Sequence, residues 1–169
     1  MKKLVKGLMA FVLMVTLVGC GNQGVAGPSG SLEEIVESMY EQKPVEFAVG
    51  TVPMDIMNDN AMLLSYTGLA SNELIEEVLV SESMMGSQAY SIVLVRVKDA
   101  SDTASVAEEM KAGIDPRKWI CVEADDMQVV AANDVVLLAM MSSEFSEMIT
   151  SQDFVDMFRE LSGGLDIEL

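Results

Sequence analysis

The sequence predicts an α+β domain in which two β-hairpins form an antiparallel sheet, packed on one side by helices. Two pairs of apolar, β-branched segments, each joined by a short turn, predict the hairpins. Amphipathic stretches before, between and after these pairs predict the helices. Half of the 169 residues are apolar, which is enough to build a core. The predicted domain spans residues 32–164, and residues 165–169 are expected to form a C-terminal tail.

The first helix is expected to begin after Ser31. Ser31 and Glu34 have the spacing of a capping box. Residues 44–58 are expected to be extended and irregular, because two prolines and a glycine interrupt them. A short helix is expected from about Asn58 to Gly68, with the glycine supplying its left-handed end. The apolar residues at helical spacing in the first helix are Leu32, Ile35, Val36, Met39 and Tyr40.

The two hairpins and two further helices follow in alternation. The turn pairs Gly86-Ser87 and Asn133-Asp134 predict where each hairpin folds back. A helix of about ten residues is expected between the hairpins, and a long amphipathic helix is expected to close the domain. In order, these elements are a strand within 73–85, a strand at 89–97, a helix at 101–111, strands at 127–132 and 135–141, and a helix at 143–163.

The first 19 residues are expected to be a signal peptide. Three lysines precede residue 7, and the apolar run at 8–18 is about 11 residues long, short of the roughly 20 that span a bilayer. The segment Leu17-Val18-Gly19-Cys20 resembles the lipobox of bacterial lipoproteins. The resemblance implies cleavage between Gly19 and Cys20 and a diacylglycerol joined to the Cys20 thiol. The alternative is an ordinary secretion signal that contains a cysteine.

Residues 20–31 are expected to be the lipidated cysteine followed by a flexible tether, since this stretch is rich in glycine and serine. The protein is therefore predicted at the cell membrane, held by its acyl anchor in the membrane lipid, with the domain on the extracytoplasmic face.

The charge balance is strongly acidic. The net charge of the whole chain is −17, and from Cys20 onward seven Lys and Arg against 27 Asp and Glu give −20. Such a body repels phosphate backbones, so a nucleic acid partner is not expected. The acidity suits a basic partner or a cation, but solubility outside the cell is the favoured explanation. The chain has no histidine, so it forms no Ser-His-Asp triad and no imidazole zinc site.

One basic spot stands out in the acidic body, at Arg117, Lys118 and Trp119. Arginine and tryptophan are typical anchors of interfaces, so this spot is a candidate site for an anion or a partner. The alternative is a solvated turn with a buried indole. The neighbouring acids Asp125 and Asp126, with Glu123, are interpreted as a solvated loop rather than a divalent-cation site, and no metal site is predicted.

Cys121 and the methionine pairs are the remaining candidates. Cys121 follows two cations that could lower the pKa of its thiol, but its apolar neighbours favour a small buried side chain. The pairs Met84-Met85 and Met140-Met141 could hold Cu(I) as thioethers. Gap-filling in the core is favoured, and an exposed methionine surface would suit an adaptable binding site.

From Leu32 to about Leu161 the chain resembles a family of small lipoproteins from Gram-positive, clostridia-like bacteria, whose domain has no known function. The stretches that carry the resemblance are "LEEIVESMYEQ", Tyr66-Thr67-Gly68-Leu69 with "ELIEEVLV", "YSIVLVRVKD", and "DPRKWICVEADDMQVV" before "DVVLLAMM". The resemblance implies a membrane-anchored, extracytoplasmic domain and lends no catalytic residue.

The sequence therefore predicts a non-enzymatic lipoprotein whose domain binds a protein or a small ligand, without a cofactor. Two alternatives stay open. One is an accessory subunit of a cell-envelope or transport complex. The other is a hydrolase that uses only aspartate and glutamate.

Overall fold

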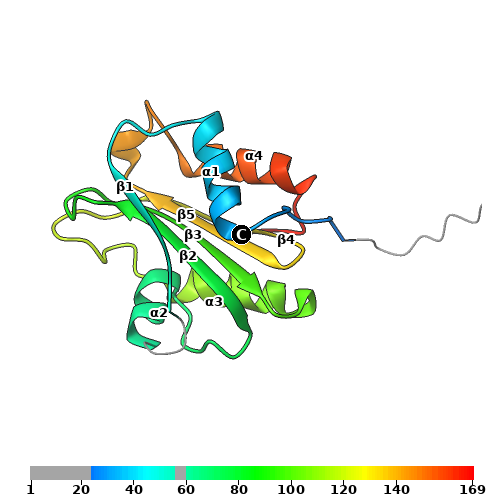
Figure 1. Cartoon of the computed structure of the whole chain (residues 1–169). Helices are drawn as coiled ribbons and strands as arrows, with labels where there is room; N and C mark the ends of the chain where they lie inside the picture. Colours follow the sequence, from blue (N-terminus) through cyan, green and yellow to red (C-terminus); the bar gives the residue numbers. More distant parts are fainter. Residues whose placement is uncertain (1–23, 56–59) are drawn as a thin grey trace, which may run out of the picture.

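The computed structural model describes residues 24–55 and 60–169. They form one open, antiparallel sheet of six strands in the order β1-β2-β3-β5-β4-β6 (Figure 1). The predicted signal peptide, with Gly19, and the predicted lipidation site Cys20 lie outside the described residues. In chain order the elements are α1 (Leu32–Gln42), β1 (Val49–Pro53), α2 (Asn60–Thr67), β2 (Ile75–Ser83), β3 (Tyr90–Val97), a 3-10 turn (Ala100–Asp102), α3 (Thr103–Gly113), β4 (Asp126–Ala132), β5 (Val135–Met141), a 3-10 turn (Ser143–Phe145), α4 (Ser151–Ser162) and β6 (Ile167–Glu168).

The central strands β3 and β5 determine how the domain is layered. Every residue of β5 is buried, and in β3 only Arg96 is less than fully buried. Because side chains alternate along a strand, such strands need apolar cover on both faces of the sheet. The α1 and α4 helices cover one face and the α2 and α3 helices cover the other (Figure 1). The α+β class and the two hairpins are confirmed, but the prediction of helices on one side only is wrong.

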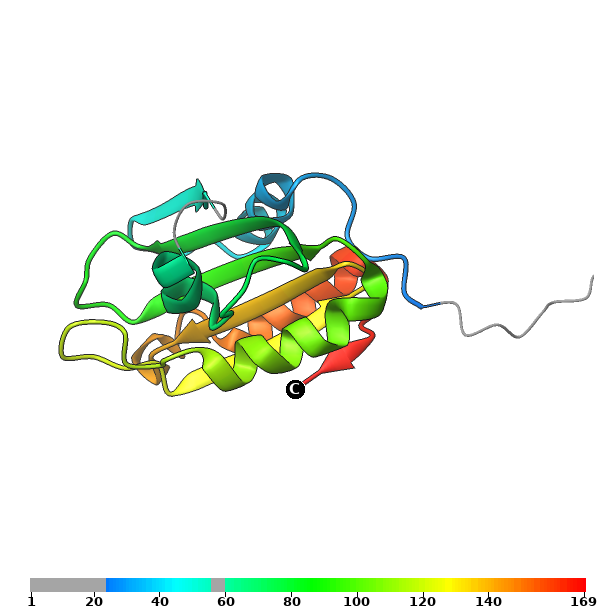
Figure 2. The same ribbon diagram turned by 90° about the horizontal axis from the view of Figure 1, so that it is seen from below.

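Each face has its own apolar layer. On the α1/α4 face, the rings of Phe154 and Phe158 are buried in the same cluster as Leu32 and Met39 of α1. On the opposite face, Val106, Ala107 and Met110 of α3 pack with the alternate residues of β3 and β5. Figure 2 shows the second face, with α3 lying lengthwise along the sheet and the shorter α2 beside it.

The two helices of the α1/α4 face each have a side-chain cap at the N-terminus. The Glu34 amide donates to the Ser31 hydroxyl, and the Ser31 amide donates to the Glu34 carboxylate, so the predicted capping box is confirmed. Thr150 and Asp153 form the same reciprocal cap at α4. The last helix therefore begins at Ser151 rather than at Ser143, because the chain first makes a separate 3-10 turn.

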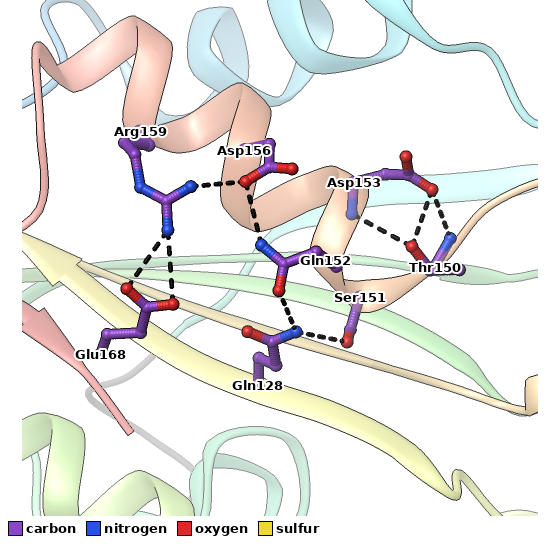
Figure 3. Close-up of polar contacts among 8 residues, drawn as sticks. All are labelled: Gln128, Thr150, Ser151, Gln152, Asp153, Asp156, Arg159 and Glu168. Atoms are coloured by element: carbon purple, nitrogen blue, oxygen red, sulfur yellow. Dashed lines mark hydrogen bonds and ion pairs between the residues drawn. The ribbon is translucent and has the colours of Figure 1, made fainter.

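Two short strands extend the sheet beyond the predicted hairpins. β1 lies within the segment that was expected to be irregular, and it pairs with β2. β6 lies within the predicted C-terminal tail and pairs with β4. Figure 3 shows how polar side chains hold this second edge: Arg159 of α4 contacts both Asp156 and Glu168, and Gln152 contacts both Asp156 and Gln128.

Residues 24–31, the described part of the predicted tether, lie against the domain. The Val25 amide donates to the Asp166 carboxylate at 3.0 Å. The Arg96 guanidinium donates to the Gly30 carbonyl at 2.9 Å. We call residues 24–31 the N-terminal arm. In contrast to the free tether that its composition predicts, the arm is docked at one end of the sheet.

The α2 and α3 helices meet through two glycines. Gly68 ends α2 with φ of +82°, the left-handed conformation that the sequence predicts. A β-carbon built on Gly113 would lie 2.1 Å from the Gly68 carbonyl oxygen. The backbones therefore approach more closely than any other residue allows, and this contact sets the position of α2 relative to the sheet.

Replacing Gly113 by alanine tests this contact. Alanine usually stabilises a helix relative to glycine. Here, however, its methyl group would clash with the Gly68 backbone, and no side-chain rotation can relieve a clash with backbone atoms. We expect Gly113→Ala to lower the free energy of unfolding by about 2–3 kcal/mol in urea denaturation. Gly86→Ala is the matched control, because a β-carbon there meets nothing within 4 Å. A gain of stability in Gly113→Ala would show that the helices do not touch as described.

Candidate functional site

An apolar groove opens on the α2/α3 face. It lies between β1, β2 and α2 and has a volume of about 390 Å³. This part of the α2/α3 face, over β1 and β2, is not covered by α3, since α3 packs along β4 and β5. The apolar side chains in the groove lining are Val52, Pro53, Met54, Met62, Val80 and Met84.

Strand alternation determines which residues line the groove. In the β1–β2 pair, Gly50 lies opposite Glu82, and both line the groove, as does Val52 two positions further along β1. The Thr51 side chain points to the other face, where its hydroxyl lies 2.8 Å from the Ser81 hydroxyl. One face of β1 is therefore tied to the sheet by hydrogen bonds, and the other face lines open space.

Apolar side chains of the groove are exposed to an unusual degree. The exposed fraction is 57% for Val52 and 73% for Met84. Apolar side chains that gather at an open concave surface are typical of binding sites. Methionine is suited to such a site because its flexible, polarisable side chain adapts to different shapes.

Gly50 keeps the groove open. A β-carbon at this position would meet only the Met84 side chain, at an ordinary contact distance of 3.7 Å. Gly50 does not have a positive φ, so a larger side chain fits the backbone without strain. The missing side chain therefore leaves volume that a ligand can occupy.

A buried ion pair stands beside the groove. The Lys118 Nζ lies 2.5 Å from the Glu82 Oε1, and the Lys118 side chain is only 9% exposed. The same Nζ lies 4.7 Å from the Tyr66 ring centre and 5.1 Å from the Trp119 ring centre, which is the geometry of cation–π contacts. Glu82 and Tyr66 also line the groove, so Lys118 supports the groove from behind.

The buried environment of Lys118 disfavours the charged form of its side chain. Burial lowers the pKa of Lys118 below its ordinary value, and attraction by the Glu82 carboxylate offsets only part of this shift. The Nζ also lies 3.4 Å from the buried Ser91 hydroxyl. These contacts hold the loop 114–125 against the sheet, since Lys118 of this loop contacts both Glu82 of β2 and Ser91 of β3.

The structure divides the predicted basic spot. Lys118 and Trp119 come together at the sheet, whereas the Arg117 side chain is 75% exposed. The Arg117 Nε lies 3.8 Å from an Asp115 oxygen, which is a loose surface pair. The three residues thus do not form one positive surface. Lys118 neutralises Glu82, which lines the groove, from behind the groove wall.

The prediction that Cys121 is a small buried side chain is wrong. Cys121 is exposed and has φ of 64°, in the left-handed region. The neighbouring Ile120 is exposed too. Lys118 and Trp119 take the inward places in this irregular loop, and the left-handed turn then directs Cys121 outward.

The two methionine pairs have different environments. Met140 and Met141 are buried, one in each apolar layer, and confirm the interpretation as core residues. Met84 and Met85 are exposed, which contradicts that interpretation for this pair. The β2–β3 turn carries them out of the sheet, so Met84 can line the groove.

Asp125 and Asp126, which were interpreted as part of a solvated loop, cap a 3-10 turn and a helix. The Asp125 carboxylate accepts both the amide and the hydroxyl of Ser143 at 2.6 Å, and these hydrogen bonds lower the pKa of Asp125. Asp126 accepts the Ser151 amide at the start of α4. Within the part of the chain that the structure describes, no group of three or more His, Cys, Asp or Glu could hold a metal ion.

The comparisons with known proteins add no relative. No family model matches the chain, no curated protein matches it, and no solved structure matches it. The resemblance to a lipoprotein family therefore stays a prediction. None of the helices within 24–55 and 60–169 has the length and apolarity that crossing a bilayer requires.

Sequence reasoning missed most of the groove. Gly50 and Val52 lie in a segment that proline and glycine made look irregular, and Glu82 has no motif around it. One signal was available: residues 44–95 contain seven acids and not a single Lys or Arg. This long stretch of one charge sign, which also carries the Met84-Met85 pair, could have marked this side of the domain.

Replacing Lys118 by methionine tests the ion pair. The substitution removes the cation and leaves the Glu82 carboxylate uncompensated in a largely buried place. We expect Lys118→Met to lower the free energy of unfolding by about 2–3 kcal/mol, and Glu82→Gln in the same chain to recover part of this loss.

Lys111→Met is the matched control, since Lys111 is an exposed residue of α3. Urea denaturation should show a change within about 0.5 kcal/mol for this control. Equal stabilities of Lys118→Met and Lys111→Met would show that the pair does not hold the loop.

Proposed function

We propose that the protein is a membrane-anchored, extracytoplasmic lipoprotein whose non-enzymatic α+β domain binds an apolar ligand in the groove. The observation that carries this proposal is the groove itself. Valine and methionine side chains are left exposed there on a sheet whose other apolar surfaces are covered by helices. Leaving such surface in water costs about 25 cal/mol per Å², so a ligand that covers it gains that free energy.

The charge around the groove limits the ligand further. All lining residues come from the stretch 44–95, which has acids but no Lys or Arg. The nearby Lys118 is paired with Glu82. We therefore expect an apolar ligand that is neutral or positively charged, because an anion would be repelled.

The N-terminal arm and the Met84 end of the groove lie at different ends of the strands. The N-terminal arm contacts Arg96 near the C-terminal end of β3, whereas Met84 directly follows the C-terminal end of the antiparallel neighbour β2, so the two contacts lie at opposite ends of this strand pair. A lipid on Cys20 would hold the arm end toward the bilayer. The groove would then face away from the membrane, toward extracytoplasmic ligands.

Lipid attachment is tested by metabolic labelling with an alkyne-bearing fatty acid. We expect the wild-type protein to carry the label and Cys20→Ala to lose it, because the thiol is the acceptor. Cys121→Ala is the matched control and should keep the label, since it removes the other cysteine of the chain. Label retained in Cys20→Ala would exclude the lipobox.

Ligand binding is tested with a photoreactive alkylammonium probe that carries a diazirine, applied to the full chain in zwitterionic nanodiscs. We expect peptide mapping to find the label within residues 50–54 and 80–84. Gly50→Leu fills the groove and should reduce this labelling about tenfold, the equivalent of ~1.4 kcal/mol.

Gly86→Leu adds the same side chain where the structure has open space, so its labelling should equal that of the wild type. Equal labelling of both leucine variants, or no label in the groove, would contradict the proposal.

A further inference from the structure

We infer that the occupant of the groove is an extended, cationic segment of a partner protein, which adds a strand to the open edge of β1. This inference rests on the proposed function and specifies its ligand. Three observations carry it: the unpaired edge, the position of the groove beside that edge, and the charge of the surrounding chain.

Within residues 24–55 and 60–169, no strand pairs with the outer edge of β1. β1 is the first strand of the sheet and, among the described residues, pairs with β2 alone. Its residues 51–53 are exposed. An exposed strand edge presents N–H and C=O groups that a second chain can pair with, and many peptide-binding domains use this mode.

The register shows which backbone groups are available. The Met84 amide donates to the Ala48 carbonyl, and the Met54 amide donates to the Val78 carbonyl at 2.9 Å. Even-numbered residues of β1 therefore direct their backbone groups to β2. Because these groups alternate along an antiparallel strand, the amides of Val49 and Thr51 point outward.

Proline limits the length of this edge. Pro53 occupies an outward-facing position, where its missing N–H breaks no bond to β2. It also offers no donor to an incoming strand. The edge therefore has outward amides at Val49 and Thr51 and ends at Pro53, which suits a short segment and discourages extended aggregation.

The groove gives this pairing its side-chain specificity. A strand added beside β1 directs alternate side chains to the α2/α3 face, next to Gly50 and Val52. Apolar side chains on that face would enter the groove and cover the exposed Val52 and Met84. On the other face, Thr51 is already hydrogen-bonded to Ser81, so we expect the side chains that the added strand directs to this face to be less restricted in type.

The charge of the partner follows from the same surface. The chain from 44 to 95 supplies β1, β2 and α2 and contains seven acids without a Lys or Arg. A segment in which basic and apolar residues alternate would place its apolar side chains in the groove. Its cations would be attracted at long range by the domain as a whole, because the net charge of the chain from Cys20 onward is −20.

The test uses a synthetic heptapeptide in which lysine alternates with valine, and the full chain in zwitterionic nanodiscs. Hydrogen–deuterium exchange is followed at single residues. We expect the peptide to slow exchange at the Val49 and Thr51 amides about tenfold, because they gain partners. The Gly50 and Val52 amides already face β2 and should not change.

N-methylated peptides provide the matched controls. One form is methylated on every valine nitrogen and the other on every lysine nitrogen. Since alternate residues of a strand face β1, only one of the two forms should bind, and its identity gives the direction of the added strand. A peptide with glutamate in place of lysine should not bind.

Equal binding of both methylated forms, or unchanged exchange at Val49 and Thr51, would overturn the strand pairing. Equal binding of the glutamate peptide would overturn the cationic partner. In either case, groove labelling by the alkylammonium probe would still support the proposed function, so the two failures are distinguishable.

Discussion

The burial of β3 and β5 on both faces is the constraint on which the rest of the structure depends. Strands that carry apolar side chains on both faces cannot leave either face in water, so the domain needs two layers of helices. The α1 and α4 helices meet this need on one face with two long amphipathic elements. On the other face a long α3 and a short α2 share the task, and α3 lies over β4 and β5.

The groove follows from this uneven cover. Beyond the edge of α3, the short α2 lies beside the apolar face of β1 and β2, and α2 is held in place by the contact of Gly68 with Gly113. Lys118 lies behind the groove wall and neutralises Glu82, the acid of β2 that lines the groove. Packing therefore leaves an apolar space at the edge of the sheet, without a separate binding module.

The sequence predicted what depends on local pattern, and failed where tertiary contacts decide. The β-branched strands, the cap at Ser31 and the glycine end at Gly68 are local features, and each appears in the structure. Periodicity cannot show on which face of a sheet a helix packs, so the second layer was missed. Lys118 looked like a surface cation because its partner Glu82 is 36 residues away in the sequence. Cys121 looked buried because its neighbours are apolar, and such neighbours do not reveal that the backbone takes a left-handed turn at this residue.

The central claim is that the uncovered side of β1 and β2 binds ligand, and methionine methyl NMR tests it most directly. The full chain, labelled at its methionine methyl groups in zwitterionic nanodiscs, is titrated with octylammonium. The account predicts shifts for Met54, Met62 and Met84, which line the groove, and none for the buried Met39 and Met140. Unchanged groove methyl groups, with shifts elsewhere or none at all, would contradict it.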